Sequence, residues 1–423
     1  GQRHGSLLLI VLVAVVILSL AVYTFTGLMQ VEEEATRLQT RRLQAKYLAD
    51  SGLDYTRLYL SNSEATIRAK GGRWQNPTIF QGVPVATDVN DPGLIGAFSI
   101  ITSSLDDQGI PTSSRFGLTD ESSKINLNTL PFSDALQPGS GSQILMALPE
   151  MTEDIADAIM DWLDADDETR PFGAEAGYYE GGSPAYSAKN GPMDSLDELL
   201  LIRGVTPQLL FGLDTNRNGI LDPDEATIGD VSINDSEMYL GWSNFITLYS
   251  KESNLTAEGL PRINVNADDI EQLYDDLKSS FDDEWANFII YYRCGAEEPG
   301  PVPPAGESAV QVDPSLLPID FSQLQSRRKF NSILDLMDAY IDTSEFDEEN
   351  LISYIQSPVN GSNLGSTIPT MMGSLTTYEG ATIPGRINIM QAPRRVLMGI
   401  PGLDEETVDD IINKREFELD QPD

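Results

Sequence analysis

Twelve consecutive residues, from Asp214 to Glu225, carry the most specific chemical pattern in the sequence. Oxygen donors stand at every position where an EF-hand loop supplies a ligand, and Gly219 stands where such a loop bends sharply. Ca²⁺ is a hard cation that takes about six to eight oxygen ligands. The spacing therefore predicts a calcium site. Its ligands are the side chains of Asp214, Asn216, Asn218 and Asp222, the carbonyl of Ile220 and both carboxylate oxygens of Glu225.

The segments that flank this loop indicate what kind of site it is. Residues 206–213 suit an entering helix, whereas residues 226–230 make a poor exit helix. Such a loop is typical of the calcium clips of extracellular modules, which fix a structure and do not sense a signal. We therefore expect a structural clip. The competing interpretation is an acidic surface turn whose spacing arises by chance.

A second acidic stretch covers residues 161–168 and is followed by Arg170 and Glu175. Its carboxylates have the chemistry to hold another Ca²⁺, but they can equally cap backbone N–H groups and pair with Arg170, or simply be solvated. We favour the second interpretation. A catalytic carboxylate pair has little support, because nothing nearby indicates a nucleophile, a base or a sugar-binding cleft.

Composition excludes most enzymatic chemistry. The chain has 423 residues but only one cysteine, Cys294, and one histidine, His4. This excludes an intrachain disulfide, a Cys/His zinc cluster and a histidine-based triad. The formal net charge of -39 repels phosphate backbones at long range. We expect neither an enzyme nor a nucleic-acid-binding protein.

The N-terminal region predicts a membrane anchor. Leu7 to Phe25 carries no charge, and at about 1.5 Å per residue a helix of this length covers a hydrocarbon core of about 30 Å. The apolar run exceeds the roughly 7 to 15 residues of an ordinary signal peptide core, so we expect it to be retained. Arg3 and His4 precede it and residues 32–34 are glutamates. The positive-inside rule then places the N-terminus in the cytoplasm and the acidic bulk in the periplasm.

Apolar residues continue at helical spacing beyond the anchor. They predict one long helix over residues 6–62 whose outer half packs against a domain. Residues 71–91 are expected to be irregular, and residues 97–103 and 115–119 to form the first strands of a sheet. The apolar positions of the outer half are Leu38, Ala45, Leu48, Ala49, Gly52, Tyr55 and Tyr59.

A five-residue motif occurs three times, at residues 124–128, 262–266 and 386–390. In the first two copies, the final asparagines, Asn128 and Asn266, are expected to cap a following helix; Met390 breaks the pattern in the third. Such repeats imply repeated supersecondary units. Further segments predict capped helix starts at residues 193–199 and 330–336, and a loop at residues 357–383.

Three turns, at residues 148–152, 202–206 and 400–404, are typical of helix-hairpin-helix motifs. In DNA-binding members, the backbone N–H groups of such turns hold a phosphate. Residues 404–410 contain five acidic side chains and no lysine or arginine, so phosphate would be repelled. We therefore expect a structural role for the hairpins.

The leader Arg3-His4-Gly5, followed by Ser6 and the apolar run, resembles the type III signal of pilins and pseudopilins. The resemblance implies that prepilin peptidase cuts after Gly5 and leaves Ser6 as the first mature residue. Major pilins have a glutamate at the fifth mature position, where this chain has Ile10; in this respect it is similar to the K subunit. The runs SKINLN, DWLDADDETRPFGAE, GPMDSLDELLLIRGVTP and NFITLYS extend the resemblance to the type II secretion system protein K family.

This resemblance implies an α+β pseudopilin fold, in which a long N-terminal transmembrane helix packs on a small antiparallel sheet. It also implies a large inserted all-α domain of helix-hairpin-helix or SAM-like type. The implied protein is a minor pseudopilin of the inner membrane, at the pseudopilus tip. There it would initiate assembly with minor pseudopilins I and J and the major pseudopilin, for export of folded proteins across the outer membrane. Its implied cofactor is Ca²⁺. A minor pilin for DNA uptake and a membrane-anchored calcium-binding scaffold are the alternatives.

The expected domain order follows from these segments. After residue 294, a proline-rich stretch predicts a semi-rigid linker, and the C-terminal helical repeat unit shows no closing element and is expected to be incomplete. The expected parts are a leader (1–5), the transmembrane and stalk helix (6–62), the first β part (63–128), the inserted α domain with the calcium loop (129–237), a return strand with a second helical unit (238–294), the linker (295–320) and the C-terminal unit (321–423).

Overall fold

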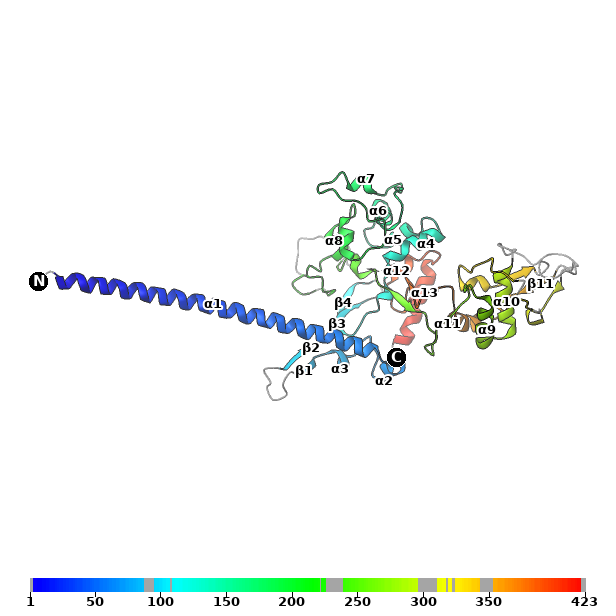
Figure 1. Cartoon of the computed structure of the whole chain (residues 1–423), viewed down its shortest axis with the longest axis horizontal. Coiled ribbons are helices and arrows are strands. Elements are labelled where there is room, and N and C mark those ends of the chain that lie inside the picture. The colour runs from blue at the N-terminus through cyan, green and yellow to red at the C-terminus, as the bar shows by residue number, and fades with distance from the viewer. Residues whose placement is uncertain are drawn as a thin grey trace. The chain divides into compact units, whose positions relative to one another are not determined.

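The chain divides into two compact units (Figure 1). Unit 1 comprises Gly1–Lys124, Leu130–Ile246 and Asn388–Asp423, and unit 2 comprises Ile125–Thr129 and Thr247–Ile387. The C-terminal unit expected from the sequence, residues 321–423, is thus divided between them. The computed structural model describes residues 3–86, 95–106, 109–220, 222–225, 239–295, 310–316, 319–321, 324–342 and 353–419.

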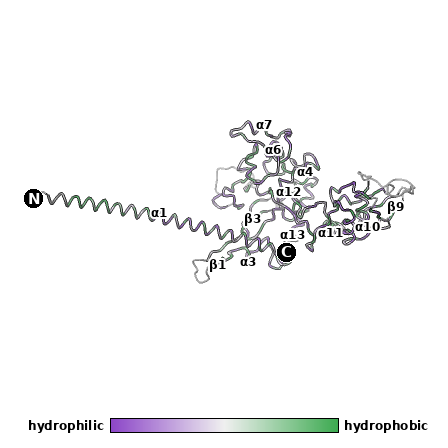
Figure 2. Tube along the Cα trace, viewed as in Figure 1, coloured by the Kyte–Doolittle hydropathy of each residue, from purple (hydrophilic) through white to green (hydrophobic). Residues whose placement is uncertain are grey.

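Helix α1 runs from Arg3 to Leu60 and confirms the long N-terminal helix. Within Leu8–Leu60, an apolar window has a mean hydropathy of 2.9 and is 0% buried. The helix is therefore long and apolar enough to cross a membrane. Figure 2 shows hydrophobic residues concentrated in the part of α1 near the N-terminus. Further along, Glu33 and Arg37 form an exposed ion pair at 2.6 Å, so this part of the helix suits water.

The C-terminal part of α1 packs closely on strand β2 (Ile95–Phe98). A Cβ added to Gly52 would lie 3.0 Å from the ring of Phe98, and a Cβ added to Gly96 would lie 2.6 Å from Leu48. Tyr55 contacts the same phenylalanine, with ring centroids 5.6 Å apart. Two glycines, one on each element, therefore allow the helix and the strand to approach, on the face where the sequence predicted packing.

Tyr59 fixes the end of α1 to the elements that follow it. Its ring meets Phe80 edge-on at 5.2 Å, and its hydroxyl donates to the Gly72 carbonyl at 2.7 Å. These rings and Ile67 form a small buried core. The core joins α1 to α2 (Glu64–Ala69) and α3 (Pro77–Phe80).

The strands of unit 1 form two antiparallel pairs, which confirms the α+β class. Strand β1 (Val83–Ala86) pairs with β2, and β3 (Ile101–Leu105) pairs with β4 (Pro111–Phe116). The expected strand over residues 97–103 is interrupted at residues 99–100, and the one over 115–119 begins earlier and ends at Phe116. The expectation of an irregular segment at 71–91 was wrong for α3, where Ile79 and Phe80 pack with Tyr59 of α1, and for β1, which pairs with β2.

Short helices make up the rest of unit 1. In α6, Ile155, Ile159 and Trp162 recur at helical spacing and are buried, which explains why this segment is a helix. Trp242 is fully buried, and its indole N–H donates to the Pro149 carbonyl at 2.8 Å. The elements are η2 (Glu121–Ser123), α4 (Leu130–Leu136), α5 (Ser140–Leu145), α6 (Glu153–Leu163), α7 (Ala176–Tyr179), η4 (Leu196–Leu201), α8 (Pro207–Phe211), η6 (Trp242–Asn244), α12 (Arg394–Met398) and α13 (Glu405–Leu419).

Each of the three predicted hairpin turns contains a left-handed residue. These are Glu150 with φ 55°, Gly204 with φ 83° and Gly402 with φ 88°. A Cβ on Gly204 would lie 2.7 Å from Ile155, so glycine is required there for space as well as for conformation. That the turns belong to helix-hairpin-helix motifs stays a prediction.

Unit 2 packs two helices, α9 (Ile270–Ser280) and α10 (Asp283–Cys294), against short strands. The chain enters through β5 (Ile125–Asn126) and η3 (Leu127–Thr129), and β6 (Ile246–Thr247) lies where the chain leaves unit 1. Its paired strands are β7 (Lys251–Ser253) antiparallel with β13 (Thr382–Pro384), β8 (Ile263–Asn264) parallel with β12 (Leu375–Thr376), and the sheet β10-β11-β9 (Tyr340–Asp342, Ser353–Gln356, Val310–Gln311). It also contains η7 (Pro314–Leu316), η8 (Ile333–Leu336) and α11 (Leu364–Ser374).

Helix α11 corrects the expectation of a loop over residues 357–383. The segment is rich in Gly, Ser and Thr, and Pro369 lies inside the helix. Nevertheless, Leu364, Ile368 and Met372 share one face and pack on the unit 2 core, together with the fully buried Met371. Burial of this apolar face outweighs the weak helix propensity of the sequence.

The repeated motif also works differently from the expectation. In every copy the first asparagine accepts a backbone N–H: Asn126 from Asn128 at 3.1 Å, Asn264 from Asn266 at 3.0 Å and Asn388 from Met390 at 3.0 Å. Asn266, which was expected to cap a helix, instead exchanges hydrogen bonds with the backbone of Phe330, and Asp269 caps α9. A short side chain reaches the N–H two residues ahead more easily than one at the start of a later helix. The third copy therefore makes the same turn, although it ends in methionine.

Two smaller expectations also need correction. The capped segments at 193–199 and 330–336 have the capping boxes of Ser195 and Ser332, but they form 3₁₀ turns and not α-helices. The run NFITLYS at residues 244–250 was expected to be a strand, but only Ile246–Thr247 is extended.

Candidate functional site

The loop from Asp214 to Glu225 begins directly after α8 and is closed by its last residue. Glu225 Oε1 accepts hydrogen bonds from the backbone N–H and the hydroxyl of Thr215, both at 2.8 Å, and from the Asn216 N–H at 3.1 Å. Its Oε2 accepts from the Asp222 N–H at 3.2 Å. Burial alone raises the pKa of Glu225, but these hydrogen bonds outweigh it and hold the pKa below its usual value. The carboxylate is therefore charged at neutral pH.

Asp214 organises the first half of the loop in the same way. Its two oxygens accept from the N–H groups of Asn218 at 3.1 Å and Gly219 at 2.8 Å. Gly219 has φ 74°, which provides the predicted bend. The side-chain amides of Asn216 and Asn218 both donate to one oxygen of Asp222, at 2.8 and 3.0 Å. The structure thus brings the described ligand residues into one closed loop.

The donor set of this loop fits Ca²⁺. Asp214 and Glu225 are 3% and 4% exposed, and none of the ion pairs between described residues includes either of them. Buried carboxylates are normally paired with a cation or bound to a metal. Carboxylates alone form no metal cluster in the described part of the chain. The fit therefore depends on the two amides and on the Ile220 carbonyl as well; Leu221 and the expected exit segment at 226–230 lie outside the described residues.

The second acidic stretch is built around Arg170, as the favoured interpretation predicted. Its guanidinium forms ion pairs with Asp134 at 3.1 Å, with Asp161 at 3.0 Å and with Asp164. Asp161 is fully buried, and burial raises its pKa. The sequence did not indicate the partner Asp134, which is distant along the chain from the acidic run.

Glu175 stands out beside this cluster, and its role was not foreseen from the sequence. It is 5% exposed, and neither carboxylate oxygen has a hydrogen-bond partner among the described residues. Burial and the neighbouring Asp161 and Asp164 raise its pKa to about 7. The signal in the sequence was its position shortly after a run of carboxylates.

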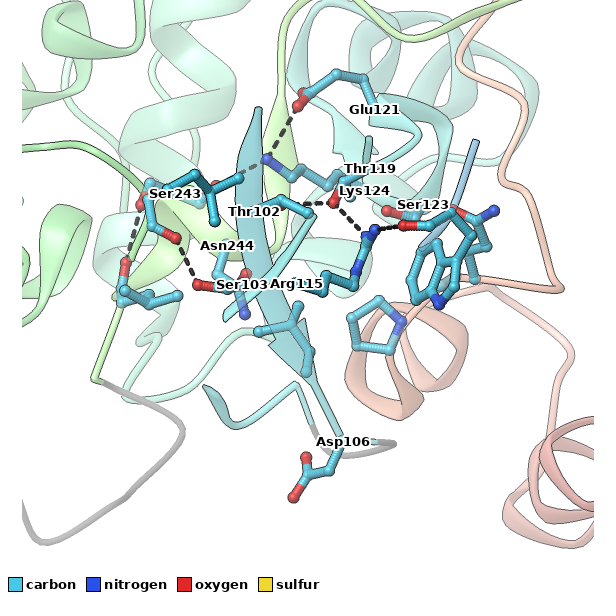
Figure 3. Close-up of a pocket in the computed structure, with 18 of the residues that line it drawn as sticks. Thr102, Ser103, Asp106, Arg115, Thr119, Glu121, Ser123, Lys124, Ser243 and Asn244 are labelled. Carbon is cyan, nitrogen blue, oxygen red and sulfur yellow. Dashed lines mark hydrogen bonds and ion pairs between the residues drawn. The ribbon is translucent and has the colours of Figure 1, made fainter. Parts of the chain in front are cut away.

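A pocket of about 240 Å³ adjoins the loop at residues 214–225 (Figure 3). Asn218 and Gly219 lie in its wall, and Ser103 of β3 donates its hydroxyl to the Gly219 carbonyl at 2.6 Å. The remaining wall comes from β3, β4, residues 119–124, residues 240–244 and residues 390–393 with Arg415. The sequence gave no sign of this pocket because its walls come from distant segments.

The predicted processing residues, Gly5 and Ser6, lie within the first turns of α1. Their backbone is helical there. The cleavage of this bond stays a prediction.

Comparison of this chain with known proteins indicates which family it resembles. A family model described as type II secretion system, protein K, matches residues 123–214. Residues 123–214 are therefore similar to a part of protein K. The match begins next to the first copy of the repeated motif and includes Arg170 with its three aspartates. It ends at Asp214, the first residue of the loop at 214–225. It confirms the resemblance that the sequence motifs predicted.

A curated relative agrees with this assignment. The type II secretion system protein K of Aeromonas hydrophila is 46% identical over 56 residues, which are 13% of this chain and 17% of the relative. The chain thus aligns with about a sixth of that protein K. A solved chain from the GspK-GspI-GspJ complex of the enterotoxigenic Escherichia coli type 2 secretion system is similar at 21% identity, with a TM-score of 0.26, over 40% of this chain and 55% of that chain.

Proposed function

We propose that this chain is a minor pseudopilin that occupies the tip of a type II secretion pseudopilus and initiates its assembly. The observation that carries the proposal is the presence of a segment similar to protein K behind a long apolar N-terminal helix on one chain. An exposed apolar helix of this kind suits both a membrane and the side-by-side packing of pilin stalks. The role that follows is structural, in the export of folded proteins across the outer membrane.

The bulk of unit 1 supports the tip position. The helices between α4 and α8 are inserted between the strands near the stalk and the rest of the unit. In a filament whose stalks pack side by side, a subunit stacked above would meet this insertion. Only the end of the filament leaves that space free.

The proposed partners are minor pseudopilins I and J, together with the major pseudopilin. The similar Escherichia coli chain is part of a GspK-GspI-GspJ complex. We infer contacts through α1, where side chains such as Leu43 and Tyr47 are exposed beyond the apolar anchor. Co-purification of the full chain with I and J from membranes tests this, and loss of both partners on Tyr47→Asp is the expected result.

We further propose an inner-membrane location with the N-terminus in the cytoplasm, and processing by prepilin peptidase between Gly5 and Ser6. Gly5→Ala should abolish cleavage and assembly, with Gly27→Ala as a control, because a Cβ at Gly27 meets nothing within 4 Å. Mass spectrometry of the mature N-terminus is the measurement. Unchanged processing and secretion in Gly5→Ala would favour a membrane-anchored calcium scaffold that forms no filament.

DNA uptake is not favoured by the hairpins. The turn before α13 is followed by Asp404, Glu405 and Glu406, and Asp404 caps the Thr407 N–H at 2.9 Å. Its carboxylate takes the position that a phosphate would need. Salt-dependent binding of double-stranded DNA by the full chain would reverse this conclusion.

The loop at Asp214–Glu225 is proposed to hold a structural Ca²⁺ through the ligands predicted from the sequence. The ion would neutralise two buried carboxylates and lock the loop. A ligand at about 100 times its Kd stabilises the folded state by about 2.7 kcal/mol, and 1 kcal/mol shifts Tm by about 2–4 °C in a domain of this size. Asp214→Ala and Glu225→Ala should therefore remove a Tm increase of several degrees on adding calcium.

Asp224→Ala is the matched control, since this exposed acidic residue lies in the same loop at a position that supplies no ligand. It should keep the increase. An original chain whose melting is the same in calcium and in EGTA would refute the metal site without touching the pseudopilin assignment.

A further inference from the structure

The pocket of unit 1 shown in Figure 3 has a basic interior, although the chain carries a net charge of -39. Arg115, Lys124 and Arg415 line it, against Glu121 and Asp106. Figure 3 shows Asp106 pointing away from Arg115, at the opposite end of β3 and β4. The local charge inside the pocket is therefore opposite to that of the protein as a whole.

Arg115 is the most deeply buried of these cations, with 3% exposure. Its guanidinium donates to the carbonyls of Trp74 and Leu118 and to the hydroxyl of Thr119, and it lies 3.5 Å from the centroid of the Trp74 ring. All these partners are neutral. The Nε donor is buried and has no acceptor among the described residues. Burial lowers the pKa of Arg115 to about 10, so the group is still protonated at neutral pH.

Lys124 supplies a second charge at the same wall. Its ammonium contacts the Glu121 carboxylate at 3.1 Å and the Ser243 carbonyl at 3.3 Å, and its side chain is 18% exposed. An ammonium has three donors, so one remains for a further acceptor. The guanidinium of Arg415 also borders the pocket and donates to the Ala392 carbonyl at 2.8 Å.

We propose that this pocket binds a small anion through a carboxylate or phosphate group, with Arg115 and Lys124 as its charged contacts. A buried cation is normally compensated by an opposite charge, and Arg115 lacks one among its described partners. Guanidinium and ammonium groups form short, strong hydrogen bonds to such oxyanions. The volume of about 240 Å³ exceeds the roughly 30 Å³ that one water occupies in the liquid, so a small molecule fits.

A purely structural role would leave a different pattern of hydrogen bonds. Arg293 of unit 2 is also fully buried without an ion pair among the described residues, but its Nε donates to the Arg328 carbonyl at 2.7 Å. Arg115 differs because its Nε has no such acceptor among the described residues and because the residue lines a cavity. The difference points to a ligand that comes from outside the chain.

Isothermal titration calorimetry of the full chain in a non-ionic detergent tests the proposal, with inorganic phosphate and malonate as separate probes at constant ionic strength. Comparison of the two probes shows whether the site prefers phosphate or carboxylate. Lys124→Gln and Arg115→Lys should weaken the preferred anion by at least about tenfold, as expected for losing one charge-assisted hydrogen bond. Lys189→Gln is the matched control, because Lys189 pairs with Asp194 and Glu198 in the same unit and does not line the pocket.

Saturable binding that both pocket variants weaken and the control retains would support the site. Absence of saturable binding for both anions, or equal affinity in Lys124→Gln and the original chain, would overturn it. Lys124 is partly exposed, so this variant decides the question even if Arg115→Lys does not fold.

Discussion

Arg170 in unit 1, which is partly buried, and Arg293 in unit 2, which is fully buried, show two ways to hold a cation in the fold. Arg170 is surrounded by Asp134, Asp161 and Asp164, whereas Arg293 donates to the carbonyls of Val265, Ala267 and Arg328 and to the Ser326 hydroxyl. Burial lowers the pKa of Arg170, but the aspartates outweigh it and the pKa is raised; burial lowers the pKa of Arg293.

This difference indicates at which of the two sites the stability depends on charge. Carboxylates change charge with pH, and they attract any cation that reaches them. Backbone carbonyls do neither, so the Arg293 site is a framework that holds strands and loops together. We therefore expect the Arg170 site to respond to pH and to ions, and the Arg293 site to be insensitive to both.

Replacing Arg293 should have the largest effect. Arg293→Met leaves three buried carbonyls without their donor, and each such group costs about 1–3 kcal/mol. We expect a loss of more than about 3 kcal/mol, equal at pH 5 and pH 8, measured by urea unfolding with hydrogen exchange in α10. Lys278→Met, which removes an exposed ion pair with Asp283 and a contact with the Tyr274 ring, should change stability little. If Arg293→Met lost little stability, or if its loss depended strongly on pH, the Arg293 site would not differ from the Arg170 site in the way proposed.

Replacing Arg170 should cost somewhat less, and the cost should depend on pH. Arg170→Met leaves three aspartates close together, which is expected to cost about 2–3 kcal/mol at neutral pH, since the side chain is 22% exposed and the site only partly excludes water. At low pH the aspartates are protonated and the cost falls. Thermal melting from about pH 4 to pH 8 measures this. The same loss at both ends of the range would mean that Arg170 acts through packing and not through charge.

Replacing Glu175 should have a smaller effect on stability, and it should stabilise the protein where the two arginine replacements destabilise it. Its pKa of about 7 lies above the usual 4.5, so the folded state binds the proton more tightly than the unfolded state. This contribution is present below the unfolded pKa and is lost as pH rises from about 4.5 to about 7. Glu175→Gln should therefore match the original chain at pH 4 and exceed it by about 1–2 kcal/mol at pH 8 in a metal-free buffer. A variant that is less stable at pH 8 would show that the charged carboxylate is needed.

The smallest effects on stability are expected at two equivalent N-caps, one in each unit. Ser195 in unit 1 accepts from the Asp197 N–H, and Ser332 in unit 2 accepts from the Leu334 N–H, both at 3.2 Å. Ser195→Ala and Ser332→Ala should each cost about 1 kcal/mol, with no dependence on pH. Chemical denaturation of the two variants measures this. A large difference between them would show that one cap also supports a contact elsewhere in its unit.

The stalk and the loop were predictable because their signals are local. An uncharged run predicts α1 from composition alone, and the ligand spacing of residues 214–225 places all donors in one loop before any fold is known. Asp134 beside Arg170, and the pocket wall at residues 390–393, were not predictable, because only tertiary packing brings distant segments together.

The wrong expectations for individual segments also arose because tertiary packing cannot be read from the sequence. Helix α11 was missed because its Gly, Ser and Thr content hid the apolar face of Leu364, Ile368 and Met372, which only the core of unit 2 makes decisive. Asn266 was expected to be a helix cap, whereas Asn264, two residues earlier, makes an Asx turn, because both structures use the same kind of side chain.

Asn126, Asn264 and Asn388 each close their own turn with the N–H group two residues ahead. The carbonyl of each asparagine also accepts from a residue further on: Asn126 from the Thr129 hydroxyl at 2.8 Å, Asn264 from the Ala267 N–H at 3.0 Å and Asn388 from the Ala392 N–H at 3.0 Å. One residue therefore fixes both the entry and the exit of the joint, and we expect a disturbance at the asparagine to loosen the chain on both sides at once.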